Sequence, residues 1–382
     1  MNLELEPFND YTIPPENLPK APTSIDLELT GKCNLSCKYC FYADCMDNKC
    51  DLDTGAWYSI ISELGDLGVH KAALSGGEVF IRDDLFDIID SLITNKMRYS
   101  ILSNGTLIKD KTIEQLNEGK RRLRLDSIQV SIDGSRAEIH DRSRPPNSFE
   151  RAVQGLRLLK KAGLPVTVRV TLNHHNVDDL DGIAHLLLDD IGLTGFSTNE
   201  AVPMGTARCQ GENILLSHEQ RDAAMTKLVE LNEQYGGKIS AQAGPLFIAR
   251  MIDEIDRLRA AGETKKMRGG TLTSCGGVFS KMCILHNGTM VPCNMLPNLV
   301  MGVAGMHSIR DAWLHSPAIN AVRYRKEVPL SSLSTCLDCA YTGFCTGGCP
   351  ALPMTTKGKL LWINPIGCYR YHKGEVEFDD LM

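Results

Sequence analysis

In the first two hundred residues, short apolar runs typical of strands alternate with longer segments whose apolar residues have helical spacing. Six short runs, rich in aliphatic and β-branched residues, have the length and composition of buried strands. We predict strands at Ile25–Leu29, Lys71–Leu74, Tyr99–Ser103, Ser127–Ile132, Val166–Leu172 and Gly195–Thr198. Longer segments between them repeat apolar residues at helical spacing, which predicts helices at Thr54–Leu67, Asp84–Thr94, Ser148–Ala162 and Val177–Leu188. Strands that alternate with helices of this length form βαβ units around a parallel sheet.

The number of these units predicts the fold class. Because six units are fewer than the eight that close a TIM barrel, we predict an α/β fold with a partial (β/α)6 TIM-like barrel. Helices around Glu219–Asn232 and Pro245–Ala261 follow, and the basic, glycine-containing run Thr264–Gly270 is typical of a connector. We therefore expect a lead-in over residues 1–22, the barrel over 23–215, a helical bridge over 216–270 and a cysteine-rich domain over 271–382.

Composition narrows the class of protein. The chain has 382 residues, 43% of them hydrophobic, and a formal charge of −6, which gives no general attraction to nucleic acid or anionic lipid. No apolar run approaches the roughly 20 residues that span a bilayer, and the acidic N-terminus has no apolar signal core. We expect a cytoplasmic protein with neither nucleic-acid nor membrane partners.

Fourteen cysteines are unusual for such a chain. Disulfides are rare in reducing cytosol, so clustered cysteines there bind metal or carry out chemistry. The scattered Cys45, Cys50 and Cys209 fit instead the role of small buried apolar residues.

Three cysteines lie close together just after the first predicted strand, spaced Cys33-x3-Cys37-x2-Cys40. Three thiolates on one short loop can hold three corners of a [4Fe–4S] cluster. The spacing supplies no fourth thiolate, so one iron stays open to a ligand, as the vacant position of a catalytic zinc site does.

Small polar residues follow several strands, where the active sites of parallel sheets lie. Ser75-Gly76-Gly77-Glu78 follows the second strand, Ser103-Asn104 ends the third, and Ser131 lies near the end of the fourth. Paired glycines let a ligand approach the backbone, and a glutamate accepts hydrogen bonds from an ammonium group. Each segment also fits a strand-end turn or cap.

The C-terminal region contains most of the cysteines and little apolar periodicity, so it needs metal to hold its shape. Its pattern is Cys275-x12-Gly288-x4-Cys293, then Cys336-x2-Cys339-x5-Cys345-x3-Cys349, then Cys368. Asn287-Gly288 is a type I′ hairpin signal. The Cys336-x2-Cys339 pair with two further cysteines also fits a zinc ribbon.

The segment from Lys32 to Phe41, including Tyr39 just before the third cysteine, resembles the signature of radical S-adenosylmethionine (SAM) enzymes. The seven-cysteine C-terminal pattern resembles the SPASM extension of radical SAM enzymes that modify peptides. This resemblance implies that the Gly-Gly-Glu segment contacts the amino group of SAM and that Tyr39, Ser131 and Arg144 belong to the SAM site, although Arg144 lies one residue further from Ser131 than in the family. It also implies that Pro203-Met204-Gly205 lies near the adenine.

The same resemblance implies three [4Fe–4S] clusters. Besides the SAM-binding cluster, a first auxiliary cluster takes Cys275, Cys293 and Cys349, and a second takes Cys336, Cys339, Cys345 and Cys368. Strand alternation puts Cys283 on the face opposite Cys293. The fourth position of the first auxiliary cluster is therefore either Cys283 or open.

As a function, the resemblance implies reductive cleavage of SAM to a 5′-deoxyadenosyl radical that abstracts hydrogen from a ribosomally made peptide. Crosslinking, thioether formation and epimerisation all remain open. Sulfatase maturases carry an aspartate base where this chain has Asn294, which argues against formylglycine formation. We expect a flavodoxin or ferredoxin-type electron donor. Because only some two dozen residues precede the first strand, we expect the barrel and SPASM surfaces, or a separate peptide-binding protein, to hold the precursor.

Two other functions fit the sequence. One is radical oxidation or decarboxylation of a metabolite or tetrapyrrole, and the other is a non-catalytic iron–sulfur electron carrier. No substrate acid or base is assigned, and strand-end position alone suggests Arg169, Asn199 and Glu200 as residues that face the cavity.

Overall fold

The computed structural model describes residues 13–14, 16, 18–46, 51–266, 269–273 and 276–381. The chain divides into two compact units. Residues 23–249 and 284–288 form the barrel unit, and residues 1–22, 250–283 and 289–382 form the cysteine-rich unit. Each unit is described by itself below.

The barrel unit is built on a parallel sheet in which each strand pairs with the next along the chain. Its strands are β1 Ser24–Thr30, β2 Lys71–Gly76, β3 Arg98–Ser103, β4 Leu125–Ser131, β5 Val166–Leu172, β6 Phe196–Glu200 and β7 Ile239–Ala241. The six predicted strands and the open, partial barrel are confirmed. The predicted strand number was too low by one, because β7 has only three residues and too little pattern to be recognised.

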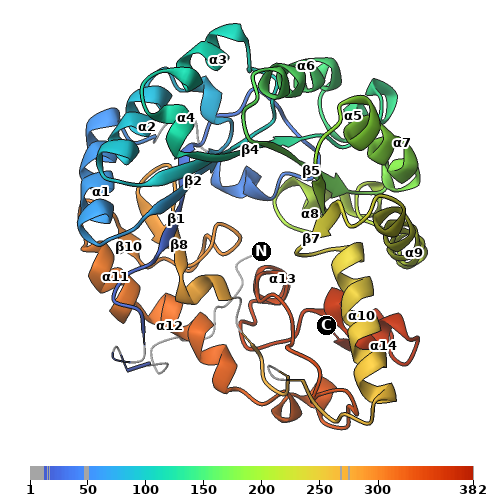
Figure 1. Ribbon diagram of the computed structural model, residues 1–382. Helices are drawn as coiled ribbons and strands as arrows, with labels where there is room; N and C mark the ends of the chain where they lie inside the picture. Colours follow the sequence, from blue (N-terminus) through green and yellow to red (C-terminus); the bar gives the residue numbers. More distant parts are fainter. Residues whose placement is uncertain are drawn as a thin grey trace. The chain divides into compact units, whose positions relative to one another are not determined.

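Helices lie along the outside of this curved sheet (Figure 1). They are α1 Thr54–Asp66, α2 Leu85–Thr94, α3 Asp110–Asn117, α4 Arg121–Arg124, α5 Ala137–Ser143, α6 Ser148–Lys161, α7 Leu180–Ala184 and α9 His218–Gln234. The short helix α8, Thr206–Gln210, instead lies against the loop that follows β1. The long helix α10, Pro245–Ala260, runs across the boundary between the units. Local signals set several starts: the Asp53 carboxylate accepts from Ala56 N at 2.8 Å before α1, and Ser217 with Gln220 forms a capping box before α9.

The helix predicted over Val177–Leu188 is not continuous. A 3₁₀ turn, Val177–Asp179, precedes α7, and a π-helical turn, His185–Asp190, follows it. The carboxylate of Asp179 accepts hydrogen bonds from Ser135 N and Ser135 Oγ at 2.7 and 2.8 Å. The Asp179 backbone, held at φ −105° and ψ 15°, lies outside the helical region. The predicted helix is therefore interrupted at the residue whose side chain binds Ser135.

Side chains alternate across the sheet, as strand geometry requires. On β5, Val168, Val170 and Leu172 are fully buried on the face against which α6 packs. The opposite face is polar. Register places Ser131 beside Arg169 and Arg169 beside Ser197, so this inner face carries Ser127, Gln129, Ser131, Thr167, Arg169, Thr171, Ser197 and Asn199. A parallel sheet with one polar face provides hydrogen-bonding groups for a ligand rather than a packed core.

The cysteine-rich unit consists of short elements joined by long turns. Its strands are β8 Lys281–Ile284, which ends at the unit boundary, β9 Thr289–Val291 and β10 Gly302–Val303, and β9 runs antiparallel to β10. Its helices after α10 are α11 Ile309–His315, α12 Pro317–Tyr324, α13 Ala351–Lys357, α14 Tyr369–His372 and α15 Phe378–Leu381. Gly288 has φ +86° in the turn before β9, as the Asn-Gly hairpin signal predicts. Trp313 is fully buried and donates from Nε1 to Pro19 O at 2.7 Å.

Candidate functional site

The loop that carries Cys33, Cys37 and Cys40 leaves the carboxyl end of β1 and is fastened at several points. Lys38 N donates to Ser143 O at 2.9 Å, at the end of α5. Thr206, the first residue of α8, donates from Oγ1 to Cys37 O at 2.9 Å and from N to Cys40 O at 3.1 Å. Elements distant in the sequence therefore fix the backbone between the three cysteines.

Two glycines let the end of β2 lie against this loop. Gly77 N donates to Thr30 O at 2.8 Å, and Glu78 N donates to Lys32 O at 2.9 Å. A Cβ at Gly77 would lie 2.0 Å from Lys32 O, and a Cβ at Gly76 would lie 2.4 Å from Thr30 O. Gly76 also has φ +132°, which L side chains rarely adopt. The paired glycines are therefore required for close backbone packing at the cysteine loop.

Glu78 is fully buried and its carboxylate is engaged within the protein. It accepts from Ser103 Oγ at 2.8 Å, from Asn104 N at 2.7 Å and from Phe80 N at 3.2 Å. Burial raises the pKa of Glu78, and these hydrogen bonds oppose the rise. In this arrangement Glu78 orients the turn after β3.

That turn reaches the cysteine loop directly. Asn104 donates from Nδ2 to Asn34 Oδ1 at 2.9 Å and lies with the same nitrogen 4.0 Å from Cys33 Sγ. Asn34 Nδ2 in turn donates to Thr106 Oγ1 at 2.8 Å. The predicted residues Glu78, Ser103 and Asn104 are thus brought together beside Cys33. Ser75 lies apart from them and donates to the buried Glu28 at 2.7 Å.

A buried ion pair lies on the other side of the loop. Arg144 donates from Nε to Asp133 Oδ2 at 2.5 Å, and its guanidinium lies over the Tyr39 ring, 5.5 Å from the centroid. Tyr39 OH donates to the same carboxylate oxygen, while Thr171 N donates to Asp133 Oδ1 at 2.8 Å. Asp133 is fully buried. The network joins the predicted residues Tyr39 and Arg144 through Asp133, which sequence reasoning did not select as a site residue although it lies two positions after Ser131.

The three thiols of the loop influence one another electrostatically. Burial, together with the Cys37 and Cys33 thiolates, raises the pKa of Cys40 to about 12. Burial also raises the pKa of Cys33 and of Cys37, which the Arg144 guanidinium opposes. The thiols are close enough to act on one another's charge, as ligands of one metal group must be.

A second set of cysteines surrounds a cavity in the cysteine-rich unit. The cavity is lined by Cys336, Cys339, Cys345 and Cys368, with Leu330 and Ile363 on its wall. Burial, together with the thiolates of Cys368, Cys336 and Cys339, raises the pKa of Cys345 to about 11. The structure therefore brings these four predicted cysteines around one enclosed space.

Within the described part of the chain, no three cysteine sulfurs lie within 4.8 Å of one another.

The remaining predicted cysteines are less closely grouped. Cys275 lies outside the described residues. Cys293 follows β9 and lies with Sγ 3.5 Å from Asn294 Oδ1. Cys349 is exposed, and Cys283 is fully buried in β8. Cys50 also lies outside the described residues, while Cys209 is exposed on α8, so its prediction as a buried apolar residue is wrong.

The polar inner face of the sheet holds the residues suggested by strand-end position. Arg169 donates from Nη2 to Gln129 Oε1 at 3.3 Å, whereas its buried Nε has no partner among the described residues. Asn199 Oδ1, on the next strand, is likewise buried without a described partner. Glu200 instead accepts from Arg221 at 2.6 Å in a buried ion pair, so the suggestion that it faces an open cavity is wrong.

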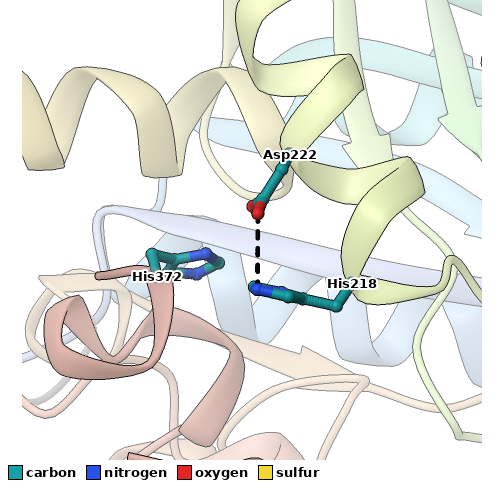
Figure 2. Close-up of side chains that lie close together, drawn as sticks. All are labelled: His218, Asp222 and His372. Carbon is teal, nitrogen blue, oxygen red and sulfur yellow. Dashed lines mark ion pairs between the residues drawn. The ribbon is translucent and has the colours of Figure 1, made fainter. Parts of the chain in front are cut away.

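A histidine–carboxylate pair lies on α9, away from the cysteine loop in sequence. His218 Nε2 and Asp222 Oδ2 are 3.3 Å apart at i,i+4 spacing (Figure 2). The third side chain drawn there, His372 of α14, belongs to the cysteine-rich unit, where its Nε2 donates to Ile366 O at 2.7 Å. The α9 pair is a local helix contact when His218 is protonated.

Among the described residues, no helix combines the length and the apolar character needed to cross a bilayer.

Comparison with known proteins relates the chain to characterised families. The model of the radical SAM superfamily matches residues 27–187, and that of the SPASM iron–sulfur cluster-binding domain matches residues 275–340. An AdoMet-dependent heme synthase of Methanosarcina barkeri is 27% identical over 92% of this chain and 97% of its own length. A PqqA peptide cyclase of Methylocella silvestris is 26% identical over 90% of this chain and 87% of its own length.

A solved structure shares the fold. SuiB of Streptococcus suis, bound to its precursor peptide SuiA, superposes with a TM-score of 0.68 at 17% identity, covering 91% of this chain and 76% of SuiB. The family matches cover both the cysteine loop and the start of the C-terminal cysteine pattern. This chain therefore carries a radical SAM domain, matched over residues 27–187, and a SPASM iron–sulfur cluster-binding domain, matched over residues 275–340.

Proposed function

We propose that this enzyme uses radical SAM chemistry to modify a ribosomally made peptide. The observation that carries the proposal is a loop of three mutually interacting thiols, fastened between Arg144 and the Gly76-Gly77 turn. It lies at the carboxyl edge of a parallel sheet whose inner face is polar. A cofactor bound at the loop would face hydrogen-bonding groups rather than a packed apolar core.

Three [4Fe–4S] clusters fit the donor sets. Cys33, Cys37 and Cys40 would hold the SAM-binding cluster, and the four cysteines around the enclosed cavity would hold a fully ligated auxiliary cluster. Cys275, Cys293 and Cys349 would hold the other auxiliary cluster, with Cys283 or a non-protein ligand in its fourth position. The four cysteines that line one enclosed space support a group that takes several thiolate ligands.

The residues around the first loop would bind and orient SAM. Ser131 and Arg169 lie side by side on the inner face of β4 and β5, and Asn104 stands beside Cys33. Glu78 and Asp133 would position these groups rather than bind SAM themselves. The Glu78 carboxylate holds the Asn104 turn, and the Asp133 carboxylate holds Arg144. When bound together, a reduced cluster and SAM supply a 5′-deoxyadenosyl radical that abstracts hydrogen from an unactivated carbon.

A peptide substrate is supported by the relatives and by the polar sheet face. The PqqA peptide cyclases are similar to this chain over most of its length. Asn199 Oδ1 and Arg169 Nε are buried polar atoms without described partners, and backbone amides and carboxylates of a peptide would satisfy them. Asn294 cannot act as a base in the position where sulfatase maturases carry an aspartate. We therefore propose crosslinking, thioether formation or epimerisation of the peptide rather than formylglycine formation.

Reduction of the clusters requires an outside donor. We propose a flavodoxin or ferredoxin-type protein for this role. The precursor would be held by the barrel and SPASM surfaces or presented by a separate peptide-binding protein.

A second candidate is radical oxidation or decarboxylation of a tetrapyrrole. It is favoured by the similarity to an AdoMet-dependent heme synthase over 97% of that protein's length. The Arg169 guanidinium would then bind a propionate side chain of the tetrapyrrole.

SAM cleavage tests the shared part of both candidates. We expect anaerobically reconstituted protein, given SAM and dithionite, to form 5′-deoxyadenosine measurable by mass spectrometry. The triple variant Cys33→Ala/Cys37→Ala/Cys40→Ala should form none, whereas Cys209→Ala, which alters an exposed thiol, should match the wild type. An electron carrier without catalytic function would form none in any of these proteins, and that result would refute the proposal.

The substrate class is tested by stimulation of this reaction. We expect a synthetic peptide, translated from a short reading frame beside the gene, to increase 5′-deoxyadenosine formation and to lose hydrogen from itself. Stimulation by an iron porphyrin with propionate side chains, and not by the peptide, would replace the peptide proposal with the tetrapyrrole one.

A further inference from the structure

The polar inner face of the barrel sheet carries an arginine that has no carboxylate partner. Three cations lie in strands β1–β7, and they are Lys71, Arg98 and Arg169. Lys71 and Arg98 both form ion pairs with Asp126. Among the described residues Arg169 forms no ion pair, and its side chain donates only to the neutral Gln129 at 3.3 Å. Burial lowers the pKa of Arg169, and no carboxylate opposes that effect. A partly buried cation of this kind lacks the counter-charge that proteins normally supply.

The acidic side chains of the inner face lie on a distant strand. Side-chain alternation places Asp26 and Glu28 of β1 on this face, because the residues between and beside them are aliphatic and fully buried on the other. The pairing order from β1 to β5 puts these acids four strands away from Arg169 along the sheet. The inner face is therefore negative at β1 and positive at β5, so a carboxylate bound to this face is favoured at β5.

A hydrogen-bond acceptor without a described partner lies next to this cation. Arg169 Nε and Asn199 Oδ1 are both buried, and neither has a hydrogen-bond partner among the described residues. Asn199 of β6 pairs with Thr171, two residues after Arg169 on the same face of β5. A strand spacing of about 4.8 Å and a rise of about 3.3 Å per residue place the Cα atoms of Arg169 and Asn199 about 8 Å apart. A donor and an acceptor at this separation form a site that a ligand with both kinds of group would complete.

The position of the pair places it beside the proposed SAM site. Register puts Arg169 next to Ser131, which is proposed to bind SAM. Two residues further along β5, Thr171 N donates at 2.8 Å to Asp133, whose carboxylate holds Arg144. A substrate group held by Arg169 would therefore lie close to SAM, where a carbon must lie for its hydrogen to be abstracted.

We propose that Arg169 and Asn199 form a subsite for an acidic residue of the peptide substrate. The Arg169 guanidinium would bind the side-chain carboxylate of an Asp or Glu, and Asn199 Oδ1 would accept a hydrogen bond from a backbone N–H of the same segment. The inference rests on the proposed function and deepens it, since it names a residue type that the peptide must carry. An iron tetrapyrrole fits this subsite less well, because it has propionate carboxylates but its ring nitrogens bind the metal and offer no N–H.

The test compares peptides that differ by one carboxylate. The full-length reconstituted enzyme is assayed for 5′-deoxyadenosine with the synthetic peptide described above, amidated at its C-terminus so that only side chains supply carboxylates. In further copies, one Glu or Asp at a time is replaced by Gln or Asn. We expect one replacement to raise the KM for the peptide about tenfold, equivalent to about 1.4 kcal/mol, because a charge-assisted hydrogen bond becomes a neutral one. In Arg169→Gln the same replacement should change KM by less than about twofold, since the two changes remove one shared interaction.

Three variants separate charge from structure. Arg169→Lys keeps the cation and should keep most of the preference for the acidic peptide. Arg98→Gln removes a strand cation that already has a carboxylate partner, so it should keep the full tenfold preference. Asn199→Asp supplies a carboxylate beside Arg169 that competes with the carboxylate of the peptide, so the preference should be lost while the iron content stays unchanged. If Arg169→Gln does not fold, the comparison of Asn199→Asp with Arg98→Gln still decides whether the peptide carboxylate is bound at Arg169.

The outcomes separate this inference from the proposed function. A peptide that stimulates SAM cleavage without any Asp or Glu, or a tenfold preference that persists in Arg169→Gln, would overturn the inference and leave the proposed function standing. If Arg169→Gln raises the KM for SAM and keeps the peptide preference, Arg169 acts on SAM and the inference is likewise wrong. If no peptide stimulates SAM cleavage and an iron porphyrin does, the peptide proposal itself is wrong, and the acidic-residue subsite is wrong with it.

Discussion

The buried network around Asp133 allows a prediction with a defined magnitude. In Asp133→Asn the side chain keeps its shape and loses its charge. In the wild type, one Asp133 carboxylate oxygen accepts from Thr171 N, while the other accepts from both Tyr39 OH and Arg144 Nε. If the Asn oxygen keeps the Thr171 bond, its amide group faces two donors. Arg144 is then a buried cation without its partner, which costs about 3–5 kcal/mol.

The loss of stability should be largest at the cysteine loop, because Lys38 N donates to Ser143 O, one residue before Arg144. Native-state hydrogen exchange of the peptide covering residues 31–46 measures this local opening. At about 1.4 kcal/mol per tenfold change in an equilibrium constant, exchange there should be faster by about 10²-fold or more in Asp133→Asn.

A matched control is available on the same sheet. Asp126 pairs with Arg98, but these side chains are 28% and 41% exposed. Partly exposed ion pairs contribute about 0–1 kcal/mol, so Asp126→Asn should change the exchange rate of the loop by much less than tenfold. If Asp133→Asn altered exchange no more than Asp126→Asn does, the proposed clamping of the loop by buried charge would be refuted.

Three further predictions follow from other contacts. Gly77→Ala places a Cβ 2.0 Å from Lys32 O, so reconstituted protein should lose iron from the loop and form little 5′-deoxyadenosine; full iron content would contradict the packing argument. Cys345→Ala should lower iron content by one cluster, measured by iron and sulfide assays, because Cys345 faces the enclosed cavity, and equal iron in Cys345→Ala and Cys209→Ala would disprove this. Burial lowers the pKa of His140 to about 4 in the folded protein, whereas the exposed ring in the unfolded chain takes up its proton near pH 6.5. The free energy of unfolding should therefore fall by about 3 kcal/mol as pH falls from above 6.5 towards 4. Urea denaturation of wild type and His140→Gln at both ends of that range should show the smaller pH dependence in the variant.

Much of the barrel could be predicted from sequence because its strands are short apolar runs between amphipathic helices. The start of α1 at Thr54 and of α6 at Ser148 follows local patterns that are visible in the chain. β7 could not be found, since Ile239–Ala241 becomes a strand only by pairing with β6. The interruption near Asp179 likewise depends on Ser135, 44 residues earlier.

The candidate site was predictable where motifs are local and not where charge is brought in from a distance. Spacing revealed the cysteine loop, the Gly-Gly-Glu segment and the four cysteines of the enclosed cavity. Asp133 was not selected, because its partners Tyr39 and Thr171 are brought to it by the fold from distant parts of the chain. Glu200 was misjudged for the same reason, since its partner Arg221 lies on α9 rather than near the strand end.

The hydrogen bond from Thr206 to Cys37 also sets the order in which the protein can mature. Those residues are 169 positions apart, so at ribosomal rates of about 5–20 residues per second the thiols emerge roughly 10–30 s before their clamp exists. During that interval the nascent loop has thiols but not the surroundings that hold them in place. Iron delivered before Thr206 and α8 have emerged would meet an unformed receptor, which makes insertion after that point of synthesis the productive route.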